Sequence, residues 1–438
     1  MSLGIEWISL IMLAMFIVLL LAGLPLAWVT GAIGTIFVLV LFDANAMVMF
    51  VSRIYRVMID YTLAAVPLFI LMASIIEKTG IAEELFQAVH VWAGGLRGGL
   101  AIGTVISCVI MAAITGVVGA EIVTFGLIAL PGMLKRKYDK KIALGSICAG
   151  GGLATLIPPS VVFIVYALEA GASVGELFLA GIIPGLILAA LFIAYIAIAT
   201  WLKPELAPAA PIEERQISLR QKVIMLKGLI MPGILAIVVL GSIFAGLATP
   251  TEAAGFGVAG ALLTGILNRR LSWKMVKSSI YETTRITCLI MWLVFGAQTI
   301  IGVYTLAGGD DFVRSALSAA PFGNWGVIIT MQLIWILLGM FIDWIGILML
   351  TVPLFLPVAL EMGFSNVWLG VVFCMNMHIA YLTPPFGPSV IYVKGIVPDD
   401  VTTMDIYNAV WPYTALTVMA LALTVLFPAI SLWLPSMG

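Results

Sequence analysis

The sequence predicts an all-α protein that crosses a membrane many times and consists of two related halves. Composition is the first reason, since 63% of the residues are hydrophobic, only 10% are charged and the mean hydropathy is +1.18. Soluble domains have roughly 25% charged residues. Paired interruptions of apolar segments by Pro-Pro are the second reason, and an uneven distribution of lysine and arginine is the third. The net charge of −1 gives no reason to expect a nucleic acid as partner.

An internal duplication relates the two halves. The segment LIPPS at 156–160 recurs as LTPPF at 382–386, and the same offset of 226 positions (158 to 384) carries Tyr166 onto Tyr392. Proline cannot donate the helix hydrogen bond and clashes with the preceding turn, so Pro-Pro breaks a helix and frees backbone carbonyls. Broken backbone at membrane depth is tolerated where it is buried in protein or lines a cavity. We therefore expect a transport site at these two breaks.

The N-terminal residues are expected to form retained scaffold helices. The apolar stretch from Ile5 to Ala22 has neither the basic segment nor the small-residue cleavage site of a signal peptide, so we interpret it as a transmembrane helix. More than ten apolar stretches of about 20 residues are expected along the chain, each long enough to cross roughly 30 Å of hydrocarbon.

Lysine and arginine indicate which segments face the cytoplasm. Clusters at 135–141, 203–227 and 269–277 are assigned to that side. The stretches between these clusters lack lysine and arginine, so each is expected to cross outward and return. Their outer turns are placed near Gly171 and at TPTE, 249–252, where Thr251-Glu252 is expected to start a helix. The proline-rich, charged linker at 203–227 separates the halves.

Two segments are predicted to enter the membrane and return to the same side. Residues 98–134 have cytoplasmic signals at both ends but are too short for two full crossings, and TGVVGA at 115–120 provides a tight turn at their centre. The equivalent segment is 325–362, centred on GMFID at 339–343. Five crossings separate the two hairpins. They are therefore expected to enter from opposite faces, which makes the repeat inverted.

The two halves are thus expected to share one plan. The first transport repeat, 98–202, contains hairpin 98–134 and a broken helix at 142–168. The second, 323–438, contains hairpin 325–362 and a broken helix at 366–393. Scaffold helices are expected at 1–97, and scaffold or arm helices at 228–322. The glycines at 150–152 are expected to belong to an unwound segment rather than to a helix-packing surface.

Enzyme, metal and disulfide chemistry are not expected. The four cysteines (108, 148, 288 and 374) stand singly in apolar segments, and the chain has only two histidines. Isolated cysteines of this kind usually behave as small buried apolar residues. A membrane-embedded enzyme would need a nucleophile with a base or a metal set.

Five motifs, spread over nearly the whole chain, resemble one family. They are LIPPS at 156–160, LFLAGIIPG at 177–185, TPTEAA at 249–254, GMFIDW at 339–344 and LTPPFG at 382–387. The sequence is similar to the large membrane subunit of the tripartite ATP-independent periplasmic (TRAP) transporters. The resemblance implies an ion-transporter-superfamily-like elevator architecture in a bacterial inner membrane. It also implies a sodium ion for coupling, no organic cofactor, a periplasmic binding protein and a small membrane subunit of about four helices.

The family's two sodium sites lie where a hairpin tip meets the unwound part of a broken helix. The matching residues are Thr115, Gly116, Gly152 and Pro158 for the first site, and Gly339, Asp343, Tyr381, Thr383 and Pro384 for the second. Sodium is a hard cation that prefers hydroxyl, carboxylate and carbonyl oxygens. The first tip departs from the serine-rich family pattern, which leaves that site with backbone oxygens and Thr115. Asp343 could instead cap the hairpin's return helix.

The resemblance implies a small organic anion, a carboxylate or a sulfonate, as substrate. Anions suit the N-termini of half-helices, where unpaired N–H groups and the positive end of the helix dipole point at the cavity. The candidate contact residues are Glu121, Ser160, Asn376, His378, Gly387, Ser389 and Lys394. Glu121 could also bind a cation or cap a helix, and Asn376 and His378 could join helices by hydrogen bonds.

The expected function is therefore secondary active, sodium-coupled import of a small organic anion that a periplasmic binding protein delivers. A proton-coupled or two-component symporter is the alternative, and a membrane-embedded enzyme is less favoured. A passive channel would not require two inverted hairpins or a binding protein.

Overall fold

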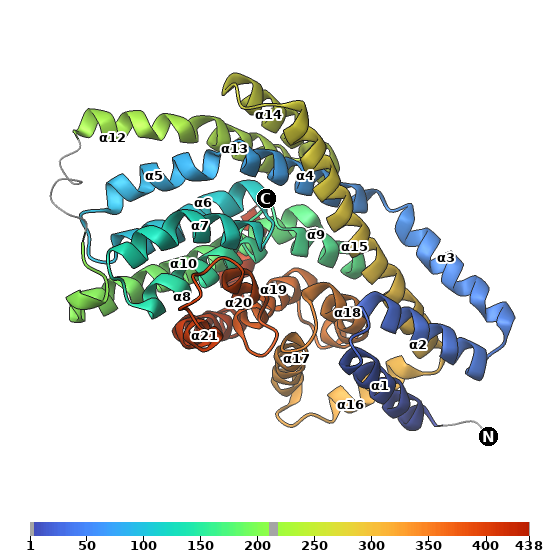
Figure 1. The fold of residues 1–438 in the computed structure, drawn as a ribbon. Coiled ribbons are helices and arrows are strands. Elements are labelled where there is room, and N and C mark those ends of the chain that lie inside the picture. Colours follow the sequence, from blue (N-terminus) through green and yellow to red (C-terminus); the bar gives the residue numbers. More distant parts are fainter. Residues whose placement is uncertain (1–3, 210–217, 438) are drawn as a thin grey trace.

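The computed structural model describes residues 4–209 and 218–437, and the regular elements in that part of the chain are all helices (Figure 1). Six apolar helical segments have at least 18 residues: Tyr61–Lys78, Val174–Leu202, Pro250–Leu267, Trp273–Leu306, Trp344–Glu361 and Thr403–Leu426. Six further apolar helices have only 10–17 residues. The prediction of a polytopic all-α protein is confirmed. The expectation of more than ten apolar stretches of about 20 residues is wrong, because many apolar segments are half-helices and hairpin arms of fewer than 18 residues.

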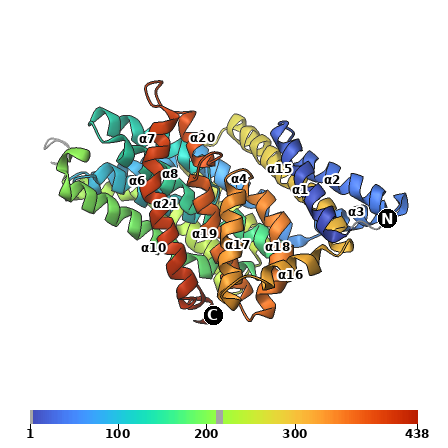
Figure 2. The same ribbon diagram turned by 90° about the horizontal axis from the view of Figure 1, so that it is seen from below.

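The helices that precede each hairpin form a scaffold. In the first half they are α1 (Ile5–Leu21), α2 (Leu26–Leu41), α3 (Met47–Met58), α4 (Ala65–Lys78) and α5 (Ile81–Ala93). In the second half they are α12 (Leu219–Met225), α13 (Ile230–Phe244), α14 (Pro250–Leu267), α15 (Trp273–Leu306) and α16 (Gly309–Ser318). Helix α15 packs along α2, and α14 packs along α4. Figure 2 shows α15 beside α1 and α2, so helices from both halves build this scaffold.

Each half also contains a helical hairpin. The first consists of α6 (Gly99–Thr115) and α7 (Ala120–Lys135), and the second of α17 (Gly323–Gly339) and α18 (Trp344–Glu361). Gly116, with φ of 63°, ends α6, and Gly119, with φ of 98°, precedes α7. Positive φ angles suit glycine, which explains the small residues in this turn. Both hairpins agree with the predicted ranges to within a few residues.

Both Pro-Pro segments interrupt a helix. The first break follows α8 (Lys140–Gly152) and its 3₁₀ turn (Leu153–Thr155), and precedes α9 (Val161–Ala170). The second separates α19 (Asn366–Leu382) from α20 (Pro388–Lys394). Both Pro-Pro peptide bonds are cis. The two interruptions lie where the sequence predicts them.

The three glycines at 150–152 are helical, so the prediction that they are unwound is wrong. They end α8, and all three are buried. A Cβ added to them would press on Cys108, Ile122 or His378, which belong to three neighbouring helices. The absence of side chains therefore serves close helix packing, and the unwinding starts only at Leu153.

The two broken helices run antiparallel. At one end the Asn366 side chain, at the start of α19, donates to the Ala170 carbonyl at 2.8 Å, and the Tyr166 hydroxyl donates to the Asn366 carbonyl at 3.1 Å. At the other end Lys140, at the start of α8, donates to the carbonyl of Asp400, beyond α20, at 3.2 Å. Because α8 follows the first hairpin and α19 the second, the bases of the hairpins lie at opposite ends of this pair.

Two long helices complete the fold, and the linker between the halves is shorter than predicted. Helices α10 (Val174–Leu202) and α21 (Thr403–Leu426) pack on the broken helices, and the short α22 (Ala429–Leu432) packs on α10. Within the predicted linker 203–227, residues 210–217 lie outside the described residues. Helix α12 already begins at Leu219, because Ser218 and Gln221 form a capping box.

The helix start predicted at Thr251-Glu252 is confirmed. Thr249 precedes α14, its hydroxyl accepts from the Glu252 N–H at 3.3 Å, and the Glu252 carboxylate accepts from the Thr249 N–H at 2.8 Å. This reciprocal pair is a capping box. It gives the first turn of α14 two side-chain partners for its otherwise unpaired amides.

Three of the four cysteines are buried as expected, but Cys288 is exposed on α15. Its helix is long, and the face that carries Cys288 points away from the packed core. Among the described residues, no group of three or more histidine, cysteine or acidic side chains could hold a metal ion.

Candidate ion and substrate site

The first hairpin tip packs directly on the first break. The Gly116 carbonyl accepts a hydrogen bond from the Val161 N–H at 3.4 Å. A Cβ added at Gly116 would overlap the carbonyl oxygen of Pro159, and its φ is already in the left-handed region. Glycine is therefore required at this contact for two independent reasons. The backbones of the tip and the break are therefore in direct contact.

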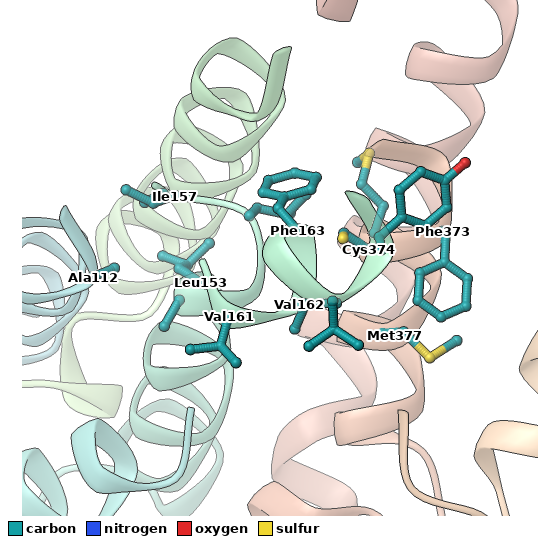
Figure 3. Close-up of a cluster of buried hydrophobic side chains, with 14 of the residues drawn as sticks. Ala112, Leu153, Ile157, Val161, Val162, Phe163, Phe373, Cys374 and Met377 are labelled. Carbon is teal, nitrogen blue, oxygen red and sulfur yellow. The ribbon is translucent and has the colours of Figure 1, made fainter. Parts of the chain in front are cut away.

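Apolar side chains of the break, the start of α9 and α19 pack together at the first break (Figure 3). Figure 3 shows Val161, Val162 and Phe163 at the start of α9 between residues of the break and residues of α19. Leu153 and Ile157 belong to the break, and all five of these side chains are buried. Desolvated backbone of this kind is stable only when its polar groups find partners.

Side chains of the break supply some of those partners. The Thr155 hydroxyl donates to the Gly152 carbonyl at 3.0 Å, and the Ser160 hydroxyl donates to the Thr155 carbonyl at 2.8 Å. Ser160 occupies the N-cap position of α9, but its side chain does not cap that helix. The amides of Val162 and Phe163 consequently have no hydrogen-bond partner among the described residues. The α9 N-terminus is open to an acceptor from elsewhere.

A buried carboxylate lies behind the first tip. The Thr115 hydroxyl donates to Glu121 Oε1 at 2.6 Å and also lies 2.9 Å from the Met111 carbonyl oxygen. Glu121 Oε2 has no hydrogen-bond partner among the described residues, although the side chain is only 2% exposed. An unpaired carboxylate oxygen at this depth is unfavourable. It makes Glu121 a candidate cation ligand, as one sequence interpretation proposed.

The second tip meets the second break in a related way. The Phe386 N–H donates to the Met340 carbonyl at 3.2 Å. Asp343 is the N-cap of α18, and its carboxylate accepts from the Ile345 N–H at 3.4 Å. Its predicted capping role is confirmed, while its role in binding an ion stays a prediction. Thr383 donates to the Ile379 carbonyl at 2.7 Å, which leaves the hydroxyl lone pairs available.

A cavity of about 230 Å³ lies between the two hairpin tips, and we call it the central cavity. Both tips, both broken helices and the scaffold helices α4 and α15 contribute to its wall. The wall residues from the tips and the broken helices include Gly116, Val161, Val162, Asp343, Trp344, Ile345, Tyr381 and Tyr392. Of the residues assigned to sodium from the sequence, this cavity brings together Gly116, Asp343 and Tyr381.

A second cavity, of about 300 Å³, adjoins the first, and we call it the side cavity. The two share Val117, Val118, Tyr392 and the scaffold residues Ile70 and Ile286. The side cavity continues between α7 and the scaffold helices α4 and α15. Its polar wall contains Ser74, Glu77 and Glu282. Together the two cavities separate the first hairpin tip from the scaffold.

Hydrogen bonds and an ion pair order the acidic wall of the side cavity. The Glu77 carboxylate accepts from the Thr124 hydroxyl at 2.8 Å, which joins α4 to α7. Glu282 pairs with Lys78 at 2.7 Å and accepts from Ser74 at 2.9 Å. Lys78 ends α4 and donates to the Ser278 hydroxyl at 3.0 Å. Ser278 directly follows the basic cluster 269–277, which is predicted to face the cytoplasm.

Asn376 and His378, two candidate substrate residues, face other helices instead of the cavities. The Asn376 amide donates to the Gln332 side-chain oxygen at 2.9 Å, so the interhelical interpretation is confirmed for Asn376. His378 is fully buried against Gly152, with its ring 5.9 Å from that of Phe192. Neither lines the central or the side cavity.

The candidates around α20 are also absent from both cavity walls. Gly387 is the N-cap of α20, and Ser389 is buried inside it. The Lys394 ammonium donates to the Val401 carbonyl at 2.7 Å. Its charge therefore stabilises the turn after α20.

Sequence reasoning missed three side chains of the cavity walls. Tyr392 is shared by both cavities, Trp344 follows the second tip, and Glu77 faces the first hairpin. The duplication does mark Tyr392, because it is the counterpart of Tyr166, but the pattern gave no reason to place it at a cavity. Glu77 stands near the end of an apolar stretch, where an acidic residue ordinarily marks the water boundary.

The donor groups at both tips fit sodium better than a transition metal. The first tip contains the Glu121 carboxylate and the Thr115 hydroxyl, while the second tip contains the Asp343 carboxylate and the second break contains the Thr383 hydroxyl. These are hard oxygen donors, which alkali and alkaline-earth cations prefer.

Comparisons with known proteins agree with this architecture. The family model described as the DctM component of the tripartite ATP-independent periplasmic transporters matches residues 13–430. The C4-dicarboxylate TRAP transporter large permease protein DctM of Pseudomonas aeruginosa is 29% identical, over 93% of each chain. The ectoine/5-hydroxyectoine TRAP transporter large permease protein UehC of Ruegeria pomeroyi is 33% identical, over 85% of this chain and 86% of its own.

A solved structure shares the fold alone. The YdaH transporter of Alcanivorax borkumensis superposes with a TM-score of 0.60 at 15% identity, over 88% of this chain and 89% of its own. The family match over nearly the whole chain, together with the apolar helices described above, establishes a multi-pass membrane transporter rather than an enzyme. The chain belongs to the DctM component family of the tripartite ATP-independent periplasmic transporters.

Proposed function

We propose that this chain is the large permease of a sodium-coupled importer for a small organic carboxylate. The observation that carries the proposal is the central cavity, because both hairpin tips and both broken helices meet around it. Such interrupted helices place unpaired amides and freed carbonyls at one point near the middle of a membrane. Carbonyl and carboxylate oxygens suit sodium, and helix N-termini suit a carboxylate.

The relatives support the substrate class in its coarse form. One named relative is a permease for C4-dicarboxylates and another for ectoine and 5-hydroxyectoine. These compounds share a carboxylate. Val162 lines the central cavity, and its amide has no hydrogen-bond partner among the described residues, so we expect such a carboxylate to bind at the N-terminus of α9.

The two cavities suggest the route of the substrate through the permease. The central cavity lies between the tips, and the side cavity continues toward Lys78 and the basic, cytoplasmic end of α4. Alternating access would require the hairpins and broken helices to move against α4 and α15. The Glu77–Thr124 hydrogen bond crosses this boundary and would break during the movement.

Two partners follow from the family, and we propose both for this chain. A tripartite periplasmic transporter needs a binding protein that delivers the substrate and a small membrane subunit. The proposed sodium coupling also makes transport sensitive to membrane voltage. Each net charge that moves inward gains about 2.3 kcal/mol per 100 mV, so two sodium ions with a monovalent anion would accelerate uptake at an inside-negative potential.

Reconstitution tests this proposal. Vesicles that contain this chain and its small subunit should accumulate a labelled carboxylate above its outside concentration. They should do so only with an inward sodium gradient and with the binding protein outside. Equal uptake in potassium would contradict sodium coupling. Rapid, saturable, sodium-driven uptake without the binding protein would instead identify a two-component symporter.

A further inference from the structure

The internal duplication places one scaffold helix beside each hairpin, and the two places are packed differently. The residues AGL at 22–24 recur at 245–247, an offset of 223 positions (22 to 245), which makes α1 and α13 counterparts. This offset carries three residues of α1 onto three of α13: Met12, Leu13 and Phe16 onto Leu235, Ala236 and Val239. The α1 residues face α15 and α17, and the α13 residues face α4 and α6, which are the corresponding elements of the two halves.

In the first half, protein alone closes this place. Helix α13 packs on α6, and its three residues line one narrow gap with Ala113 and Ile114 of α6. The space between these side chains does not admit a water molecule. Such packing is usual in a protein interior, where few voids exceed the size of a water molecule.

In the second half, the same place is a cavity of about 210 Å³, which we call the apolar cavity. Its wall consists of three residues from α1, three from α15 and four from the second hairpin. Among these, Tyr304 alone has a polar group in its side chain, and its hydroxyl already lies 2.9 Å from the Ser9 hydroxyl. An ordered water molecule needs two to four polar partners. The apolar cavity therefore has no means of holding water in place.

The apolar cavity is continuous with the surface that faces the membrane. Leu13 lines the cavity and is 54% exposed, so the cavity opens beside it. Leu10 and Ile17 on α1 are exposed as well, as are Leu333 and Leu337 on α17. The chain is a multi-pass membrane protein, so such apolar surfaces lie against hydrocarbon.

The size of the cavity excludes a helix as its occupant. One turn of an α-helix, about 5.4 Å long and about 10 Å wide, fills roughly 400 Å³. That is more than the volume of the apolar cavity, about 210 Å³. Lipid tails are as apolar as leucine and surround the protein. An unfilled void would deprive the surrounding side chains of their dispersion contacts.

We propose that one acyl chain of a membrane phospholipid occupies the apolar cavity. The chain fills the gap between α1 and the second hairpin, whereas side chains of α13 fill the corresponding gap beside the first hairpin. The lipid is thus a structural part of the contact between the scaffold and the second hairpin. The inference concerns neither the substrate nor the coupling ion, so it can fail while the proposed function stands.

Photochemical cross-linking tests the inference in vesicles that contain this chain and its small subunit. The probe is a phospholipid with a diazirine midway along one acyl chain, and mass spectrometry locates the adducts. We expect adducts at Met12 and Phe16, which line the cavity but are only 5% and 8% exposed. Adducts confined to exposed residues such as Leu10 would overturn the inference, because lipid would then contact only the outer surface.

Variants that fill the apolar cavity provide the second test. Leu13→Trp should lose the adducts at Met12 and Phe16, since the larger side chain takes the place of the acyl chain. Leu10→Trp is the matched control, because Leu10 is equally exposed on α1 but does not line the cavity, and it should keep both adducts. Leu354→Phe fills the cavity from α18 and gives a second variant if Leu13→Trp does not fold. Undiminished adducts in a folded filling variant would overturn the inference.

Omission of the small subunit distinguishes lipid from a protein cover. Adducts at Met12 and Phe16 should form equally with and without that subunit. Adducts that form only in its absence would show that the small subunit covers the cavity, and would overturn the inference.

Discussion

In each half a hairpin tip packs on the break of a helix, and we call this pair a tip-and-break unit. The two units have the same order of elements but different surroundings. In the first, every residue from 151 to 160 is buried, and the tip glycine presses on Pro159. In the second, Phe341 of the tip is 60% exposed and Phe386 of the break is 37% exposed. The first unit is therefore an internal part of the fold. The second is open to its surroundings, where rearrangement costs less packing.

The carboxylates of the two units also differ in how enclosed they are. Glu121 is enclosed and hydrogen-bonded to Thr115, whereas Asp343 caps a helix at the wall of the central cavity. This difference suggests that changes in the first unit act mainly through stability. Changes in the second should act mainly through ion dependence.

The largest effect is expected for Gly116→Ala. The added Cβ would overlap the Pro159 carbonyl, and the left-handed backbone alone costs about 1–2 kcal/mol for a residue other than glycine. Overpacking adds roughly 1–3 kcal/mol. We expect a large drop in the unfolding midpoint of the purified protein and loss of uptake.

Gly171→Ala is the matched control for this change. Gly171 has nearly the same φ, 62°, but an added Cβ would meet nothing within 4 Å. It should show the backbone cost alone. If the two variants are equally stable, the tip does not press on the break as described.

A smaller loss of stability is expected for Thr115→Val. Removal of the hydroxyl leaves the buried Glu121 carboxylate without its hydrogen-bond donor, which costs about 2 kcal/mol or more. Thr104→Val serves as control in the same helix, because the equally buried Thr104 bonds only to the Leu100 carbonyl. Chemical unfolding in detergent compares the two. Similar losses in both variants would mean that Glu121 does not depend on Thr115.

The second unit should respond through sodium dependence. Asp343→Asn and Thr383→Val each remove a proposed ion ligand while most packing remains. Each should raise the sodium concentration for half-maximal uptake roughly tenfold, which corresponds to about 1.4 kcal/mol of binding. Thr414→Val removes a similar buried hydroxyl outside the site and should leave the sodium concentration for half-maximal uptake unchanged. Unchanged sodium dependence in both test variants, at normal expression, would reject the second ion site.

The sequence predicts the architecture of this site better than its chemistry. Pro-Pro and the TGVVGA turn have strong local meaning, so both breaks and both hairpin tips lie where expected. The glycines at 150–152 carry no such local signal, because glycine serves packing and unwinding equally well. Their role is decided by Cys108, Ile122 and His378, which are distant in the chain.

The walls of the cavities depend on tertiary contacts in the same way. Tyr392 reaches the central cavity because Gly119, more than 270 positions earlier, leaves room for its ring. The Asn376 amide donates to Gln332 and the Lys394 ammonium donates to the Val401 carbonyl, and neither residue lines the central or the side cavity. Their residue types and their positions within apolar segments suggested substrate contacts for both. A buried polar side chain can equally form its hydrogen bonds with an acceptor inside the protein, and the sequence does not distinguish the two cases.

The orientation of the two hairpins is the central claim, because the proposed ion and substrate sites require their tips to meet from opposite faces. Two single-cysteine variants, Lys137→Cys and Met362→Cys, test this orientation. The native cysteines, including the exposed Cys288, are first replaced by serine. Labelling is compared in intact inverted and right-side-out vesicles. A membrane-impermeant maleimide should label Lys137→Cys from the cytoplasmic side alone and Met362→Cys from the outer side alone. Labelling of both positions from one side would contradict the inverted arrangement.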